Sequence, residues 1–304
     1  PALSAAGGLS VITSGYANPT TKIGVNIAAK VYDTDNSANN SAMAITTANA
    51  KALGYTGFAG SDASITFSSQ FAFDFDPRGC IAANSYDFIG IATHEIGHAL
   101  GFVSGVDTYD YFGPRGPGAG TTLNLNDYAI ASTLDLFRYA KDPTNLVAGT
   151  APVLDWSVGG APYFSVDGGA TMLNTGTGTA LFATGGYNGN GRQASHWTDN
   201  RYGVLTNGCQ ARTLSRGLLD PTSGKCELLA VSSLDLAAFD AIGWNLADGS
   251  RDVSNIRFTT AQIANLPRTG VNIGGVPEPA TWSLLVLGFG SVGALLRRQR
   301  EAAA

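Results

Sequence analysis

The segment THEIGHALGF, residues 93–102, places two histidines and a glutamate close together on a predicted helix. His94 and His98 are four positions apart, so on an α-helix they lie about 40° apart around the axis and project from one face. Glu95 stands a further step around the helix, close enough to contact water beside an ion that both histidines hold. The segment therefore predicts one half of a metal site, and the other half must come from elsewhere in the chain.

The helix that carries this segment has to open its ligand face to a cleft and bury its opposite face. Ser85 is the expected N-cap, and Asp87 is favourably placed near the positive N-terminal end. Gly101 is expected to end the helix, because glycine adopts positive φ at little cost. The apolar residues expected to face the core are Ile89, Ala92, Ile96 and Ala99.

Several residues downstream are candidates for the third metal ligand. Zinc in hydrolases usually takes three protein ligands and leaves one position for water. Ser104 stands where the short pattern HExxHxxGxxH has its last histidine, so that pattern is excluded. Glu227, beside Cys226, is a poor candidate, and the other glutamates, Glu278 and Glu301, belong to the C-terminal tail. Asp107 remains open, because zinc accepts a carboxylate.

His196, in the segment RQASHW, is the favoured third ligand. The chain has three histidines, and with His196 all of them belong to one site. A site of His94, His98 and His196 matches the three-histidine sets that catalytic zinc (Zn2+) uses. Glu95 would act in it as the general base.

The composition narrows the class of protein. With 304 residues and 44% hydrophobic content, the chain can bury one large core or two subdomains around a cleft. A net charge of -5 gives no basic surface, which argues against nucleic acid as a partner. The 39 glycines and 13% charged residues indicate many turns and long loops. The first ten residues lack the charged start and apolar run of a secretory signal, so we expect a mature or trimmed product.

The periodicity of apolar residues predicts a chain of mixed secondary structure. Alternation predicts strands at residues 21–32 and 63–75, with a helix at residues 41–55 between them. Helical spacing predicts a closing helix at residues 232–246. We expect an α+β fold with the following parts: an N-terminal subdomain with the active-site helix at residues 1–101, a loop-rich C-terminal subdomain that supplies the third ligand at 102–246, a linker at 247–275 and a sorting segment at 276–304.

The three cysteines show no metal-binding spacing, so a disulfide is the better interpretation. Cys209 and Cys226 bracket a short loop, and closing it would stabilise the fold by about 3 kcal/mol through the unfolded state. Cys80 would then be left over, either buried or reactive.

The C-terminal tail has the composition of a sorting signal. Residues 280–296 are uncharged and apolar, short for a membrane span, and the arginines of RRQR follow them. The segment VPEPATWSLLVLGFGSVGALLRRQR closely resembles the PEP-CTERM signal of Gram-negative bacteria. This resemblance implies export, exosortase-type sorting machinery as a partner, and a cell-surface or extracellular-matrix location with transient membrane anchoring by the tail helix.

The metal-site segments also resemble a known family. HEIGHALGF followed at long distance by SHW is similar to the leishmanolysin-like branch of the metzincins, zinc proteases in which an inserted subdomain precedes the third histidine. Further segments, among them LDLFRYA, GLLDPT and DLAAFDAIGW, resemble bacterial metalloproteases that carry a PEP-CTERM signal, over roughly residues 71–244. The resemblance implies a zincin-like catalytic domain with a mixed sheet. Leu219 stands where the family has the methionine of its turn beneath the zinc, and we expect this change to be tolerated because the volumes are similar.

The expected function is that of an exported zinc metalloendopeptidase acting on a protein or peptide substrate. Residues 65–69, ITFSS, are the candidate edge strand for pairing with an extended substrate. The alternative is a non-catalytic cell-surface or matrix protein with a structural zinc site. Glu95 favours the enzyme, because a purely structural site has no use for a carboxylate beside its ligands.

Overall fold

The computed structural model describes residues 11–15, 26–121, 124–141, 152–175, 178–199, 209, 216–246 and 256–266. The predicted sorting segment, with the proposed span at 280–296, lies outside these residues, as does most of the predicted linker. No helix within the described part of the chain is long and apolar enough to cross a membrane.

The strands are short, and the largest sheet is mixed. This sheet has five strands in the order β2-β1-β6-β5-β7, with β1 parallel to β6 and the other neighbours antiparallel. Its strands are β1 (Val11–Gly15), β2 (Asn26–Asp33), β5 (Arg138–Lys141), β6 (Pro152–Trp156) and β7 (Tyr163–Phe164). The remaining strands form pairs: β3 (Phe73–Asp74) with β4 (Tyr86–Asp87), β8 (Asn174–Thr175) with β9 (Gly178–Thr179), and β10 (Ala230–Ser232) with β11 (Arg257–Thr259).

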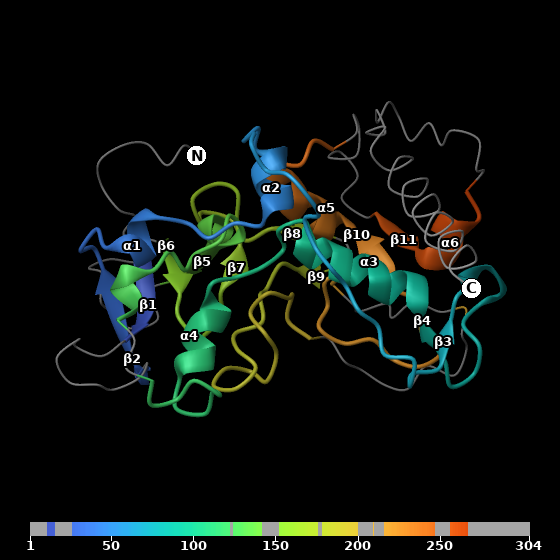
Figure 1. Ribbon diagram of the computed structural model, residues 1–304, viewed down its shortest axis with the longest axis horizontal. Helices are drawn as coiled ribbons and strands as arrows, with labels where there is room; N and C mark the ends of the chain where they lie inside the picture. The colour runs from blue at the N-terminus through green and yellow to red at the C-terminus, as the bar shows by residue number, and fades with distance from the viewer. Residues whose placement is uncertain are drawn as a thin grey trace, which may run out of the picture.

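The longest described helix is α3 (Phe88–Ala99), which carries the metal-site segment. The other α-helices are α1 (Ala38–Ser41), α2 (Thr47–Ala52), α4 (Val106–Phe112), α5 (Ser233–Ala241) and α6 (Thr260–Ala264). Short 3-10 turns are η1 (Pro77–Gly79), η2 (Leu125–Asp127) and η3 (Leu134–Phe137). The five-stranded sheet lies at one side of the molecule and α3, α5 and the β10–β11 pair at the other (Figure 1). This mixture of helices and small sheets agrees with the predicted α+β class.

The five-stranded sheet draws on both predicted subdomains. β1 and β2 come from the first hundred residues, and β5, β6 and β7 come from the loop-rich part after α3. Between residues 102 and 195 the described elements are short, and α4, with 7 residues, is the longest. These short elements agree with the loop-rich character expected of this part, and the division into subdomains stays a prediction.

The predicted helices are present but shorter, and one predicted strand is wrong. The helix expected at 41–55 is α2, which begins where the Thr46 side chain accepts a hydrogen bond from Asn49 N–H. The helix expected at 232–246 is α5, with Ser232 and Asp235 forming a capping box. The strand expected at 21–32 is β2, beginning at Asn26 in the described chain.

Residues 63–75 form a strand only at β3. Their alternating aromatic residues instead pack on one another and on Phe88, with ring centroids of Phe73 and Phe88 5.3 Å apart and those of Phe75 and Phe88 4.6 Å apart. Alternation predicted a strand along the whole segment, but only Phe73 and Asp74 pair with a neighbouring strand, β4, among the described residues.

Two details of α3 differ from expectation. Its N-cap is Asp87, whose carboxylate accepts a hydrogen bond from Gly90 N–H at 3.0 Å, and not Ser85. The residues of α3 that are fully buried are Gly90 and Gly97, whereas the predicted apolar face (Ile89, Ala92, Ile96 and Ala99) is only half-buried. The helix packs through its glycines because neighbouring leucines approach its backbone: a Cβ at Gly90 would lie 2.5 Å from Leu229 Cβ. Gly101 does end the helix region at positive φ, +115°, as predicted.

The core beneath α3 is built from aromatic and leucine side chains of the later chain. Trp197 is fully buried, stacks on Phe182 with ring centroids 5.1 Å apart and meets Phe102 edge-on at 5.0 Å. Leu219 and Leu234 are buried in the same cluster. The residue that follows His196 is therefore anchored in the largest apolar cluster.

The disulfide differs from the prediction. Cys80 pairs with Cys209, with Cα atoms 4.5 Å apart, and Cys226 is a free, half-buried thiol. The predicted Cys209–Cys226 pair is therefore wrong. The fold brings Cys80 to Cys209 across 129 positions of sequence, while the Cys226 thiol lies 3.7 Å from the carbonyl oxygen of Ile81.

Candidate metal centre

The three histidines of the chain converge on one point. Their Nε2 atoms are separated by 3.1 Å between His94 and His98, and by 3.2 Å from His196 to each of the other two. They come from α3 and from a loop about a hundred residues later in the chain. Among the described residues, this is the group of His, Cys, Asp and Glu side chains whose atoms lie close enough to hold a metal ion.

The spacing of these nitrogens suits a tetrahedral ion. Zinc bound at about 2.0–2.1 Å with tetrahedral angles holds its nitrogen ligands about 3.3 Å apart. The observed 3.1–3.2 Å is close to this value. Three imidazole ligands leave the fourth position of such an ion open. The donor set therefore fits zinc, although nitrogen ligands also suit other transition metals.

Main-chain carbonyls orient each ring. The Nδ1 atom lies 2.7 Å from Leu218 O in His94, 2.8 Å from Phe102 O in His98 and 3.2 Å from Gln193 O in His196. A carbonyl oxygen only accepts hydrogen bonds, so each Nδ1 carries the proton and donates it. Each neutral ring then turns the lone pair of Nε2 toward the other two, which is the arrangement that metal-bound histidines have.

The electrostatics favour the neutral forms of His94 and His196. Burial lowers the pKa of His94, and the neighbouring His98 lowers it further. Burial, followed by the charges of His98 and His94, lowers the pKa of His196 to about 3. Metal ligands have to be deprotonated, so the lowered pKa values of His94 and His196 favour cation binding at neutral pH.

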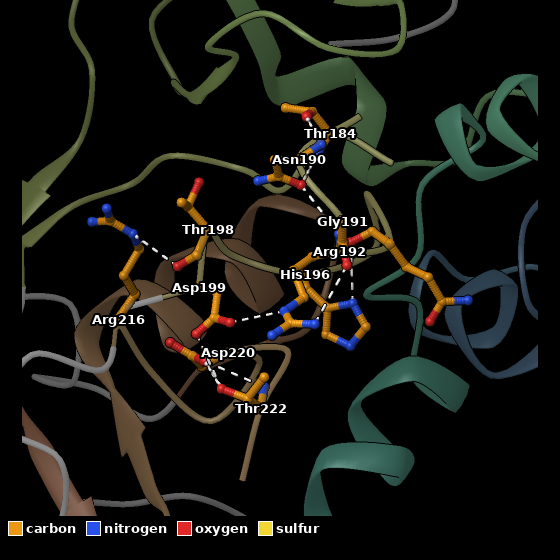
Figure 2. Close-up of polar contacts among 11 residues, drawn as sticks. Thr184, Asn190, Gly191, Arg192, His196, Thr198, Asp199, Arg216, Asp220 and Thr222 are labelled. Carbon is orange, nitrogen blue, oxygen red and sulfur yellow. Dashed lines mark hydrogen bonds and ion pairs between the residues drawn. The ribbon is translucent and has the colours of Figure 1, made fainter. Parts of the chain in front are cut away.

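The segment carrying His196 is held on both sides. His196 O accepts from Ala183 N–H at 3.0 Å, and Trp197 N–H donates to Leu219 O at 3.0 Å. Figure 2 shows Asp199 between Arg192 and Thr222, both of which donate to its carboxylate, at 2.8 and 3.0 Å. These contacts fix a ligand that lies in a loop and has no helix to orient it.

Asp107, the alternative third ligand, has another role. Its carboxylate accepts from Ala194 N–H at 2.6 Å, Ser195 N–H at 3.1 Å and Ser195 Oγ at 2.6 Å. It therefore holds the turn just before His196 and takes no part in the histidine group. Glu227 is also outside this group, and its Oε2 accepts from Gly224 N–H at 2.6 Å.

Glu95 lines a cavity of about 660 Å³ beside α3. Residues 64–68 form one wall of it, and aromatic side chains, among them Phe71, Phe73 and Tyr86, form another. The segment between α2 and β3 runs alongside α3 in Figure 1. The predicted general base thus faces a space large enough for a side chain of a bound molecule.

Two contributors to the site were not predicted. The carbonyl of Leu218 carries no recognisable side-chain signal, because any residue supplies a main-chain oxygen. Asp235, which binds the turn containing Leu218, is part of the sequence pattern Ser-x-x-Asp that marks a helix N-terminus. Such a pattern indicates a helix cap and carries no sign of a link to the metal centre.

Comparisons with known proteins identify the tail. Residues 275–300 match the PEP-CTERM protein-sorting motif. No curated protein and no solved structure matches the chain. The chain therefore carries at its C-terminal end a signal for export and for sorting to the envelope or surface of Gram-negative bacteria, which points to recognition by exosortase-type machinery.

Proposed function

We propose that this chain is an exported zinc metalloendopeptidase with a metzincin-type catalytic domain. The single observation that carries the proposal is the convergence of three Nε2 atoms within 3.1–3.2 Å of one another, next to a glutamate that faces a cavity. A structural zinc site usually has four protein ligands and needs no cavity beside it. Three ligands with an adjacent carboxylate favour catalysis over the alternative of a purely structural zinc site.

In this proposal His94, His98 and His196 hold the ion, and Glu95 moves the proton. Zinc held there would supply the Lewis acidity that makes water nucleophilic at neutral pH and that polarises a peptide carbonyl. Glu95 accepts the proton of the attacking water at a carboxylate oxygen and returns it to the leaving nitrogen. The carbonyls of Leu218, Phe102 and Gln193 keep the three rings in the orientation that this requires.

The cavity supports a peptide substrate with a large apolar side chain. Its lining includes Ile65, Phe67 and Phe71, and Glu95 is the charged side chain in it. The backbone of residues 64–68 makes no backbone hydrogen bond to any other described residue. These N–H and C=O groups suit pairing with an extended peptide, although the segment itself is not a strand.

The C-terminal sorting segment bears on where the protein acts. We infer that the helix expected at residues 280–296 anchors the exported chain in the membrane until exosortase-type machinery processes it. The catalytic part would then act at the cell surface or in the extracellular matrix.

The test measures zinc content and casein cleavage by the full chain, with and without a chelator. The parent chain is expected to bind one zinc ion and to stop cleaving casein when the chelator removes that ion. Glu95→Gln is expected to keep the zinc and lose cleavage by about 100-fold or more, because the amide cannot take up a proton. His196→Ala is expected to lower zinc affinity by at least about tenfold.

Glu227→Gln is the matched control, since it makes the same change at the other glutamate of the described chain. It is expected to keep both zinc and cleavage. Zinc binding without any cleavage in the parent would support the structural-zinc alternative. Cleavage by Glu95→Gln at the parental rate would exclude the proposed role of Glu95.

A further inference from the structure

Asp235 lies in the core behind the histidine group and is 1% exposed. Its Oδ2 accepts from Leu218 N–H at 2.7 Å and from Ser232 N–H at 2.7 Å. Its Oδ1 accepts from Trp197 Nε1–H at 2.9 Å and from Leu219 N–H at 3.3 Å. One carboxylate therefore joins three chain segments: the turn at 217–219, the loop after His196 and the start of α5.

The first link runs to His94. Asp235 fixes the N–H of Leu218, and the carbonyl of Leu218 accepts the Nδ1 proton of His94 at 2.7 Å. A shift of this turn would move the carbonyl and rotate the imidazole. The position of His94 Nε2 thus depends on a carboxylate that the ring does not touch.

The second link runs to His196. The indole N–H of Trp197 donates to Asp235, and the main-chain N–H of Trp197 donates to Leu219 O at 3.0 Å. The residue next to the third histidine is therefore bound to the same carboxylate and to the same turn. Asp235 connects the supports of two histidines that stand about a hundred positions apart in sequence.

The chemistry of this position calls for a carboxylate. Only an ionised carboxylate offers two oxygens that both accept several hydrogen bonds. Burial raises the pKa of Asp235, but the donors from Leu218, Trp197, Ser232 and Leu219 oppose this effect because they stabilise the charged form. An asparagine here would turn an NH2 group toward N–H donors and lose at least two of the bonds. The space is also filled, since a Cβ at Gly217 would overlap Asp235 Oδ2.

We propose that Asp235 is a positioning residue of the metal centre, which sets the distance between His94 and His196 through Leu218 and Trp197. This inference rests on the proposed zinc site, but not on peptidase activity. Partners that orient metal-binding histidines typically contribute about 10–100-fold to metal affinity.

The test compares the zinc affinity of the full chain, by competition with a chromophoric chelator, with that of Asp235→Asn and Trp197→Phe. All measurements are made below the unfolding temperature of each variant. Asp235→Asn is expected to bind zinc about tenfold more weakly. Trp197→Phe keeps an aromatic ring but removes the indole donor and part of the buried ring, and it is expected to bind about fivefold more weakly. The absorption bands of the Co2+-loaded variants should also shift, because the ligand geometry changes.

Asp33→Asn is the matched control. Asp33 is buried, 3% exposed, and accepts from the side-chain amides of Asn39 and Asn40 at 3.0 Å each, at the end of β2. This variant is expected to lose stability while keeping the parental zinc affinity and Co2+ spectrum. Parental affinity in either folded Asp235→Asn or Trp197→Phe would overturn the proposal, as would an equal loss in Asp33→Asn. A parent that binds zinc but cleaves nothing would overturn the peptidase alone, and a parent that binds no zinc would overturn both.

Discussion

Leu219 packs against α3 at the sequence position where the metzincin resemblance leads one to expect methionine. Its side chain is fully buried, and a Cβ at Gly97 of α3 would lie 3.2 Å from its Cδ1. Its carbonyl accepts the main-chain N–H of Trp197. The Leu219 side chain therefore fills space beside α3, and its main-chain carbonyl binds Trp197. This packing role depends on the volume of the side chain, and the sulfur of a methionine is not needed for it.

At this scale we predict that Leu219→Met is tolerated. The two side chains are similar in volume, so the free energy of unfolding is expected to change by less than about 1.5 kcal/mol, with zinc affinity unchanged. Leu219→Ala leaves a cavity and is expected to cost about 2–5 kcal/mol. Urea denaturation and chelator competition measure the two quantities. A loss of zinc affinity in Leu219→Met without a loss of stability would contradict the packing role.

At the scale of elements, α3 is held at its N-terminus by a residue that also reaches α6 and the segment before β10. The Asp87 carboxylate caps Gly90 N–H, accepts from Leu229 N–H at 3.0 Å and accepts the hydroxyl of Thr260 at the start of α6. A capping carboxylate on a positive helix end is stabilising on its own. Here it also fixes the helix against the segment that leads into β10.

We therefore predict that Asp87→Ala lowers the free energy of unfolding by about 2–4 kcal/mol, because the cap and two buried hydrogen bonds are lost together. Ser85→Ala removes the residue that the sequence suggested as the cap, and it is expected to change stability by less than about 0.5 kcal/mol. Denaturant melts of both variants decide between the two residues. Equal losses would show that the cap is not Asp87.

At the scale of the whole molecule, the Cys80–Cys209 disulfide joins the chain before α3 to the chain beyond His196. It closes a loop with a sequence separation of 129 that contains all three histidines. A link over such a distance restricts the unfolded chain strongly. The export signal in the tail agrees with a disulfide, since bridges persist in oxidising compartments.

We predict that the Cys80→Ser, Cys209→Ser double variant loses about 4–5 kcal/mol of unfolding free energy relative to the oxidised parent. Cys226→Ser is the control and is expected to stay near the parental stability. Denaturation with and without reductant measures the effect, and non-reduced peptide mapping identifies the pair. A peptide linking Cys209 to Cys226 would contradict this pairing.

Local patterns allowed part of the fold to be predicted. The helix around His94, its end at Gly101 and the helix after Ser232 follow from spacing, glycine and capping residues, all of which act within a few positions. The strand expected at residues 63–75 formed only at β3, because alternation shows which side chains are apolar and not whether a neighbouring strand exists. The N-cap shifted by two residues, since Asp87 meets partners that only folding provides.

The sequence by itself determined which residues can form the candidate site. The HExxH spacing singled out His94, Glu95 and His98, and the count of three histidines favoured His196 as the third ligand, with Asp107 as the alternative. Only the tertiary structure decided how these residues are held. It assigned Asp107 to the turn before His196, paired Cys80 with Cys209 and brought Asp235 behind the site. The physical reason is that such contacts join positions far apart in the chain. The type of a residue limits which partners it can bind, but only the packed core brings one of those partners within reach.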